Sequence, residues 1–199
     1  ADRETTSITK SLFKDNKNQI FEFYANTSLD IDSCSFIGNS NRILYAVGGS
    51  KTSIGRCVFE KNILPTIDDK KSDLVFSYGN VDVKSSSYFD NECGNLVLAT
   101  SVDVENSTFV KNDVYSIIFQ SNSGDIFRLS NNTIISNRAS SFPLHSNSSA
   151  KAYFYGNVIL DNKEDEAKMF SVDLSEFYNI QEVKYNLMDI IRKNPQTET

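Results

Sequence analysis

The sequence lacks the features that mark several common classes of protein. No apolar run approaches the roughly 20 residues of a membrane-spanning helix, so no membrane span is expected. Lysine and arginine form no long cluster and the formal net charge is -6, which disfavours a nucleic acid partner. The start, ADRETTSITK, has no apolar signal-peptide core, which is compatible with a processed product or a piece of a longer protein.

Residue types that commonly carry catalysis or bind metals are also scarce. The single histidine, His145, has no serine in a nucleophile-elbow context to accompany it and is interpreted as a turn or surface residue. The three cysteines, Cys34, Cys57 and Cys93, form no CxxC pair and give neither a metal-site signature nor a dense disulfide framework. We therefore predict no catalytic residue, no metal site and no cofactor.

A repeated phrase organises the residues that are present. Aliphatic and aromatic residues make up 39% of the chain, enough for a core, so the chain is not expected to be a disordered tail. They belong to six-residue phrases that end in asparagine, such as CSFIGN (34–39) and STFVKN (107–112). The closing asparagines lie 21 to 29 residues apart and are Asn16, Asn39, Asn62, Asn91, Asn112, Asn137 and Asn162. A period of this length indicates a solenoid.

Other residues hold fixed places relative to the closing asparagine. Three residues before it stand Phe13, Phe36, Phe59, Tyr88, Phe109, Ile134 and Ile159. Five before it stand Ser11, Cys34, Cys57, Ser86, Ser107, Asn132 and Asn157. Eight before it stand Ile31, Ile54, Val83, Val104, Leu129 and Phe154, and ten before it stand Leu29, Thr52, Val81, Val102, Phe127 and Ala152. A spacing of two residues is the strand period, and a second apolar stretch follows each asparagine, so each unit predicts two or three short strands.

These units predict an all-β fold, a parallel β-helix of about seven coils. Strands of successive coils would stack about 4.8 Å apart, so that each column becomes a ladder, with a phenylalanine stack and an inward asparagine ladder among them. An amide that stacks on an amide can be buried with its donor and acceptor both satisfied. Asparagine also tolerates the left-handed conformation of sharp turns. One domain is expected over residues 1–194, followed by a disordered tail at 195–199.

The phrases SLDIDSCSFIGN (28–39), TSVDVENSTFVKN (100–112) and IFRLSNNTIISN (126–137) resemble the right-handed parallel β-helix repeats of the pectate-lyase-like superfamily. The Cys-x-Phe-x-x-Asn form of two coils is also similar to repeats of polymorphic outer-membrane and adhesin-type surface proteins. This resemblance covers about residues 8 to 165 and implies the fold. Because enzymes and surface proteins share that fold, it does not choose a function.

Two segments depart from the regular coil. The unit from Asn62 to Asn91 is the longest, and its excess, residues 63–73, should bulge out as a loop that presents Asp68 and Asp69. Residues 163–194 lose the Phe-x-x-Asn closure and are expected to form an irregular last coil or a cap. Within them, VKYNLMDII (183–191) could be a final coil or a short helix over the end, and the coil is slightly favoured.

The outward columns hold the candidate binding residues. Nine residues before the closing asparagine stand Asp30, Ser53, Asp82, Asp103, Arg128 and Tyr153, and seven before it stand Asp32, Gly55, Lys84, Glu105, Ser130 and Tyr155. The carboxylates could bind calcium or act as an acid/base pair, although the acidic column lacks the base that lyase chemistry needs. The favoured alternative is a solvated sheet face, with Lys84 and Glu105 as a cross-strand ion pair. Tyr153, Tyr155 and Arg128 could contact sugars or a partner protein.

The inward cysteines and the glycosylation motifs complete the prediction. Cys34 and Cys57 share an inward column and should be unreactive core residues, with a disulfide between them as the less favoured alternative. Asn-x-Ser/Thr motifs occur at Asn26, Asn106, Asn131 and Asn147, by chance or as glycosylation sites. We expect an extracellular or cell-surface module, structural or adhesive, whose partners are other subunits or coils of an assembly, or surface glycans. The alternative is a polysaccharide-active lyase or hydrolase.

Overall fold

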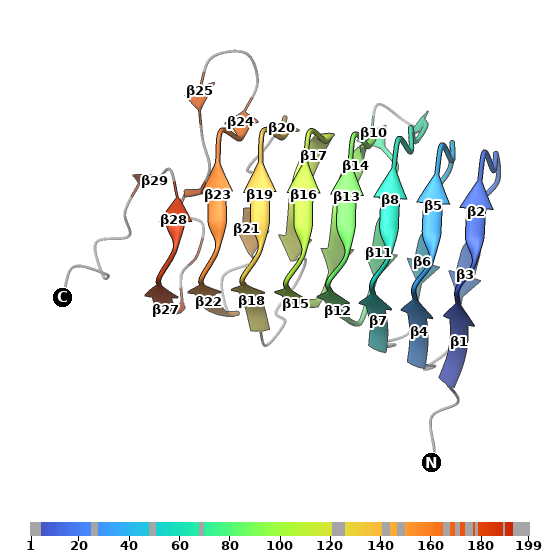
Figure 1. The fold of residues 1–199 in the computed structure, drawn as a ribbon, viewed down its shortest axis with the longest axis horizontal. Helices are drawn as coiled ribbons and strands as arrows, with labels where there is room; N and C mark the ends of the chain where they lie inside the picture. The colour runs from blue at the N-terminus through green and yellow to red at the C-terminus, as the bar shows by residue number, and fades with distance from the viewer. Residues whose placement is uncertain are drawn as a thin grey trace.

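The chain forms a parallel β-solenoid, here in a computed structural model. It describes residues 5–24, 28–47, 51–67, 70–120, 126–140, 144–146, 150–164, 168–169, 172–173, 177, 179–188 and 190–192, and none of these is helical. Successive coils stack along the long axis from the N-terminal to the C-terminal end (Figure 1). Each regular coil contributes one strand to each of three sheets, which we call sheets A, B and C. The expected fold class is therefore confirmed.

Sheets A and B carry the most regular strands. Sheet A consists of β1 (Thr5–Thr9), β4 (Ser28–Asp32), β7 (Lys51–Gly55), β12 (Asn80–Lys84), β15 (Ser101–Glu105), β18 (Ile126–Ser130), β22 (Lys151–Tyr155) and β27 (Ile180–Lys184). Sheet B consists of β2 (Leu12–Lys14), β5 (Ser35–Ile37), β8 (Val58–Glu60), β13 (Ser87–Phe89), β16 (Thr108–Val110), β19 (Thr133–Ile135), β23 (Val158–Leu160) and β28 (Leu187–Met188). With eight strands in each, the number of coils is close to the expected seven.

Sheet C is less regular, because the chain enters and leaves it through segments of variable length. It consists of β3 (Phe21–Phe23), β6 (Leu44–Ala46), β11 (Val75–Ser77), β14 (Glu92–Ala99), β17 (Asp113–Gln120), β20 (Arg138–Ala139), β21 (Leu144–Ser146), β24 (Lys163–Glu164) and β25 (Lys168–Met169). All pairs within the three sheets are parallel except β24 with β25, which form an antiparallel hairpin. The remaining strands are β9 (Thr66–Ile67), β10 (Lys70–Lys71), β26 (Val172–Asp173) and β29 (Ile190–Arg192).

Left-handed residues make the two sharp corners of each coil. Between sheets A and B they are Lys10, Ser33, Arg56, Ser85, Asn106, Asn131, Gly156 and Tyr185. Between sheets B and C they are Asp15, Gly38, Lys61, Asp90, Lys111, Ser136 and Asp161, all with φ between 49° and 65° in the two sets. The closing asparagines follow the second set and are not left-handed themselves. The expectation that asparagine recurs because it tolerates the left-handed conformation is therefore wrong. The residue before it adopts that conformation, and the asparagine makes the hydrogen bonds of the ladder.

The inward asparagine ladder is confirmed, and every interior amide in it is saturated. The Oδ1 of Asn62 accepts from both the backbone N–H and the Nδ2 of Asn39, at 3.0 and 2.8 Å. The Nδ2 of Asn62 in turn donates to Asn91 Oδ1 and to the backbone carbonyl of Phe36, at 2.8 and 3.0 Å. The same pattern runs from Asn16 to Asn162. A buried amide that loses none of its hydrogen bonds carries little desolvation cost.

The aromatic stack is also confirmed. The rings of Phe13, Phe36, Phe59, Tyr88 and Phe109 lie 4.5 to 5.0 Å apart, centroid to centroid, with interplanar angles of 7° to 11°. All of them except Phe13 are fully buried. Ile134 and Ile159 continue the column in the later coils. Burial of this stack and of the apolar columns of sheet A supplies the main favourable contribution to folding.

A second polar ladder, which the sequence analysis missed, occupies the column five residues before the closing asparagine. Asn132 donates from its backbone N–H and Nδ2 to Asn157 Oδ1, both at 3.0 Å, and Asn157 does the same to Asn186 at 2.9 and 2.8 Å. Earlier in the chain, Ser86 and Ser107 accept backbone N–H groups from the preceding coil at 3.0 and 3.2 Å. The polar residues of this column therefore provide hydrogen-bond partners for backbone N–H groups at the corner between sheets A and B.

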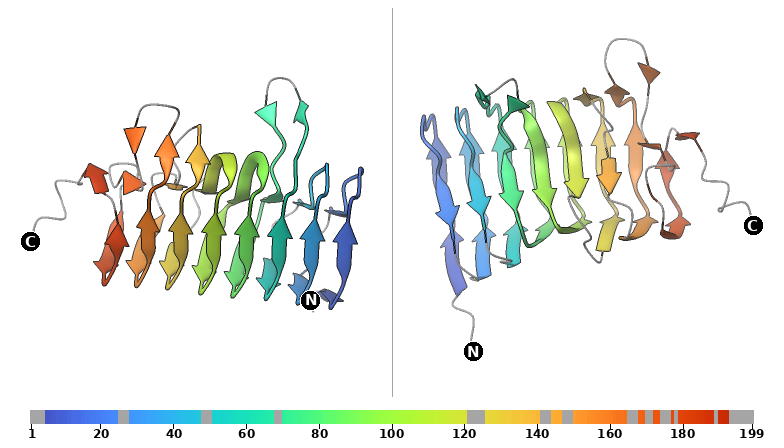
Figure 2. Two further views of the ribbon diagram at one scale, coloured as in Figure 1. Left: turned by 45° about the horizontal axis from the view of Figure 1, so that its top comes forward. Right: turned by 180° about the vertical axis from the view of Figure 1, so that it is seen from behind.

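The excess residues of the long unit bulge out as expected, and they include a short hairpin. Strands β9 and β10 pair antiparallel and project from the corner between sheets B and C, as does the β24–β25 hairpin farther along the axis (Figure 2). Gly94 allows the close approach at the base of the first hairpin, because a Cβ there would lie 2.3 Å from the Lys71 carbonyl oxygen. Asp68 and Asp69 lie outside the described residues.

Residues 180–188, near the C-terminal end, continue the solenoid, and none of them is helical. Strand β27 pairs parallel with β22, and β28 pairs parallel with β23. Residues 183–188 therefore take the coil alternative, with a register shift opposite Ala152 and Tyr153. The tail at 195–199 lies outside the described residues.

Candidate binding surface

The outer face of sheet A gathers the charged residues that the sequence placed there. In-register pairing brings Asp82 beside Asp103, Asp103 beside Arg128, and Arg128 beside Tyr153 on successive coils. The neighbouring column brings Lys84 beside Glu105 and continues through Ser130 and Tyr155 to Lys184. All of these side chains are at least partly exposed to solvent.

Several carboxylates on this face pair with a base. Lys84 Nζ lies 3.4 Å from Glu105 Oε2, which confirms the expected cross-strand ion pair. Two further carboxylates have basic neighbours, since Lys51 Nζ lies 2.9 Å from Asp82 Oδ2 and Arg128 Nη1 lies 2.9 Å from Asp103 Oδ2. That the column lacks a base suited to lyase chemistry stays a prediction. Stacking of coils brings each base within reach of the carboxylate one coil away.

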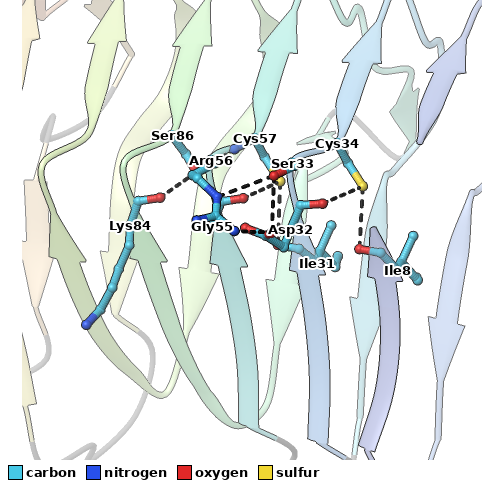
Figure 3. Close-up of polar contacts among 10 residues, drawn as sticks. All are labelled: Ile8, Ile31, Asp32, Ser33, Cys34, Gly55, Arg56, Cys57, Lys84 and Ser86. Atoms are coloured by element: carbon cyan, nitrogen blue, oxygen red, sulfur yellow. Dashed lines mark hydrogen bonds and ion pairs between the residues drawn. The ribbon is translucent and has the colours of Figure 1, made fainter. Parts of the chain in front are cut away.

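A fourth pair closes the corner between sheets A and B near the N-terminal end. Arg56 donates to the Asp32 carboxylate and, from Nε at 3.3 Å, to the Ser33 hydroxyl (Figure 3). The Arg56 hydrogen bond lowers the pKa of Asp32 below its usual value, and the same contact raises the pKa of Arg56. Both groups therefore keep their charges at neutral pH.

The proposed tyrosine contacts separate into two groups. The Arg128 guanidinium lies over the Tyr153 ring, 5.3 Å from its centroid, so one face of that ring is covered. Tyr155 instead pairs edge-to-face with Tyr185, at 5.3 Å and 85°, and these two side chains are 43% and 80% exposed. Arg128 and Tyr153 therefore form a cation–π pair, whereas Tyr155 and Tyr185 form the more open aromatic surface.

An aromatic column on the outer face of sheet C was missed. In-register pairing stacks Tyr45, Phe76, Leu98, Phe119 and His145 on successive coils. Tyr45 and Phe76 stack at 5.1 Å, Phe119 and His145 stack at 4.6 Å, and the Arg42 guanidinium lies 4.8 Å from the Tyr45 centroid. His145 thus belongs to a strand. The signal was available, because these residues are the outward alternates of the apolar stretches that follow each closing asparagine.

Comparison with known proteins agrees with this geometry. A family model described as the right handed beta helix region matches residues 23–180, about four fifths of the chain. The chain belongs to the right-handed β-helix family. No curated protein matches it. The family fixes the handedness of this β-helix and leaves its activity open.

The cysteines of this β-helix are free and buried, so the alternative of a disulfide between Cys34 and Cys57 is not realised. Cys34 Sγ lies within S–H donating distance of the carbonyl oxygens of Ile8 and Asp32, at 3.5 and 3.3 Å. Cys57 Sγ lies likewise near those of Ile31 and Gly55, at 3.5 and 3.1 Å (Figure 3). Burial raises the pKa of Cys57 to about 11, and it raises the pKa of Cys93 further. Neither thiol is a thiolate at neutral pH.

Two of the four possible glycosylation asparagines can be placed. Asn106 and Asn131 are exposed on neighbouring coils of the β-helix, at the corner between sheets A and B. Asn131 Oδ1 would lie only 2.3 Å from a Cβ on Gly156, so this side chain reaches the next coil. Asn26 and Asn147 lie outside the described residues.

The described part of the β-helix holds no group of three or more histidine, cysteine, aspartate or glutamate side chains placed to bind a metal ion. It also holds no helix long and apolar enough to cross a membrane.

Proposed function

We propose that this β-helix is a non-catalytic structural or adhesive module, secreted or on a cell surface, that forms part of an extended assembly. The observation that carries the proposal is the pairing of the outer carboxylates with bases on neighbouring coils. A glycan-cleaving site needs carboxylates that converge on one bond with room for a sugar and a water between them. On sheet A, Asp82, Asp103 and Glu105 each face their own base instead.

The rest of the proposal is supported by what the solenoid exposes. Its interior is occupied by ladders and ring stacks, so the outer side chains can vary without disturbing the fold. The open Tyr155–Tyr185 pair suits a sugar ring or a partner protein. The exposed sequons at Asn106 and Asn131 suit glycosylation in a secreted protein.

Glycan binding can be tested by comparing two tyrosine variants. Tyr155→Ala removes part of the open pair, and Tyr153→Ala removes a ring already covered by Arg128. We expect the first variant to weaken binding in a glycan array and the second to have a smaller effect. Equal effects would show that the open pair is not the contact.

A second candidate function is a polysaccharide lyase or hydrolase. It is favoured by one observation, the row of Asp82, Asp103, Arg128 and Tyr153 on adjacent coils of one face. The purified chain should be incubated with pectins, alginates and host-type glycans, with and without calcium, and assayed for new reducing or unsaturated ends. We expect none. Cleavage that disappears in the Asp82→Asn, Asp103→Asn double variant would establish the enzyme instead.

A further inference from the structure

Sheet C carries a cluster of exposed rings in its N-terminal half. Tyr45 of β6 stacks on Phe76 of the neighbouring strand β11 at 5.1 Å (Figure 1). Tyr78, directly after β11, meets the Phe76 ring at 4.9 Å and 85°. Tyr78 is 48% exposed, and the other two rings are partly exposed. Together with Arg42, which lies against two of the rings, we call these residues the Arg42 cluster.

Arg42 differs from the other arginines whose side chains the structure describes. Each of those lies beside a carboxylate of a neighbouring coil; they are Arg56, Arg128 and Arg138. The Arg42 guanidinium instead lies 4.8 Å from the Tyr45 centroid and 5.5 Å from the Phe76 centroid. Its Nε donates to the Asp73 carbonyl at 3.3 Å, while its two Nη groups have no partner among the described residues. The guanidinium is therefore held in place with its terminal donors unused.

The carboxylates on the two flanking coils already have other partners. Glu22 of β3 accepts a hydrogen bond from the Tyr24 hydroxyl. Asp73 Oδ1 accepts from the backbone N–H and the Nδ2 of Asn95, at 2.9 and 2.7 Å. Neither of these described carboxylates forms an ion pair with Arg42. Arg42 therefore presents an uncompensated charge on a planar fork of donors, which fits a carboxylate.

The rings of the Arg42 cluster favour an anionic group over a neutral sugar. A sugar ring needs an open aromatic face, but Tyr45 and Phe76 stack on each other, and Arg42 and Tyr78 cover further sides of them. The stacked rings therefore offer mainly their edges, which carry the positive part of the ring quadrupole. Ring edges and a guanidinium together attract a negative charge, and the exposed Tyr78 ring offers an apolar surface beside it.

We propose that the Arg42 cluster is a docking site for an acidic segment of a partner protein. An aspartate or glutamate carboxylate of that segment pairs with the Arg42 Nη groups, and an aromatic side chain next to it packs against Tyr78. Arginine and tyrosine are enriched in the residues that dominate protein interfaces. The inference deepens the proposed assembly module by naming one surface and the chemistry of its partner, and it rests on that function.

The probe is a short peptide with blocked termini in which glutamate and phenylalanine alternate. The matched control peptide has glutamine in place of every glutamate. Each peptide is titrated into the isotope-labelled whole chain, and backbone amide signals are followed by NMR, which also detects weak binding. We expect the acidic peptide to shift the signals of residues 42–46 and 75–78 and the glutamine peptide to bind about tenfold more weakly, because a charge-assisted hydrogen bond is lost.

Substitutions separate the cluster from the rest of the surface. Arg42→Gln should weaken binding of the acidic peptide about tenfold and leave that of the glutamine peptide unchanged, which a merely structural change would not do. Arg56→Gln is the control, because Arg56 already pairs with a carboxylate. Tyr78→Ala should also weaken binding, whereas Tyr115→Ala should not, although Tyr78 and Tyr115 are 48% and 49% exposed. Unchanged signals in sheets A and B show that each variant is folded.

Three results would overturn the proposal: an acidic peptide that shifts no signal of the cluster, equal binding of the two peptides, or equal binding by Arg42→Gln and the parent. A trigalacturonate that shifts the same signals while the peptide does not would assign an acidic glycan in place of a protein. Glycan cleavage by the purified chain would sink the proposed function and leave peptide binding as it is, so the two failures are distinguishable.

Discussion

The inside and the outside of the β-helix use the same stacking distance in opposite ways. Inside, like stacks on like, as Asn62 on Asn91 and Phe36 on Phe59. Among the charged residues outside, opposite charges meet, as Lys84 with Glu105 and Arg128 with Asp103. An amide carries both a donor and an acceptor, so it can hydrogen-bond to an identical amide on each side. A ring has two faces, so it can stack on an identical ring on each side. Charges repel their own kind, and the in-register neighbours Asp82 and Asp103 are therefore each paired with a base, Lys51 and Arg128.

The two regions also differ in what a lost contact costs. The interior is dry, so a missing partner leaves a cavity or an unsatisfied polar group. The outer ion pairs are solvated, and water replaces most of a missing partner. The effects of substitutions should therefore fall steeply from the ring stack to the surface charges.

Phe59→Ala should have the largest effect. The ring is 0% exposed and stacks on both Phe36 and Tyr88, so its truncation leaves a cavity in the centre of the column. We expect a loss of about 3–5 kcal/mol in the free energy of unfolding, measured by denaturant titration. Phe13→Ala is the matched control, because that ring is only partly buried, and it should cost less. An unchanged melting temperature for Phe59→Ala would rule out the stack as the source of stability.

Asn112→Ala should come next. The substitution removes the acceptor of Asn91 and the donor to the Tyr88 carbonyl in a dry site. We expect a loss of about 1–3 kcal/mol, and the same for Asn62→Ala. Asn18, which is exposed, provides the control, and Asn18→Ala should change stability little. If Asn112→Ala and Asn18→Ala unfold at the same denaturant concentration, the ladder contributes no specific stability.

Tyr88→Phe should stabilise the protein. Its hydroxyl is buried without a hydrogen-bond partner in the described structure, and burial raises its pKa well above the usual value. The other rings of the stack are phenylalanines, so the change removes an unsatisfied group and keeps the ring. We expect a gain of about 1 kcal/mol in denaturant titration. Tyr155→Phe, at an exposed position, should be neutral; a loss of stability in Tyr88→Phe would mean that the hydroxyl has a partner.

The interior was largely predictable because its columns repeat one chemical type. Asn39, Asn62 and Phe59 could be aligned by spacing alone. That alignment predicts the coils, the asparagine ladder and the aromatic stack. The second ladder was missed because cysteine, serine and asparagine share its column, so no single residue type marks it. Asn186 was hidden further, since its coil has lost the closing asparagine.

The outer surface was less predictable, because its contacts depend on side-chain reach as well as column. Lys84 and Glu105 lie in one column and were found. Lys51 reaches Asp82 from another column, which a column alignment does not show. Tyr185 lies at a corner position that holds residues of many types from coil to coil, so its contact with Tyr155 is not marked by the repeat.

Lys84→Gln should have the smallest effect. Lys84 and Glu105 are 59% and 40% exposed, and their charges are 3.4 Å apart, so solvent screens most of their attraction. A double-mutant cycle with Glu105→Gln should give a coupling of about 0.2–1 kcal/mol, far below the cost of Phe59→Ala. The coupling should shrink as salt is raised from low ionic strength, because the Debye length shortens. The Asn91–Asn112 pair gives the contrast, since its hydrogen bonds are buried and uncharged and should not weaken with salt. A Lys84–Glu105 coupling as large as the ladder's and equally insensitive to salt would show that the outer face is as dry as the interior, and the division between the two regions would fail.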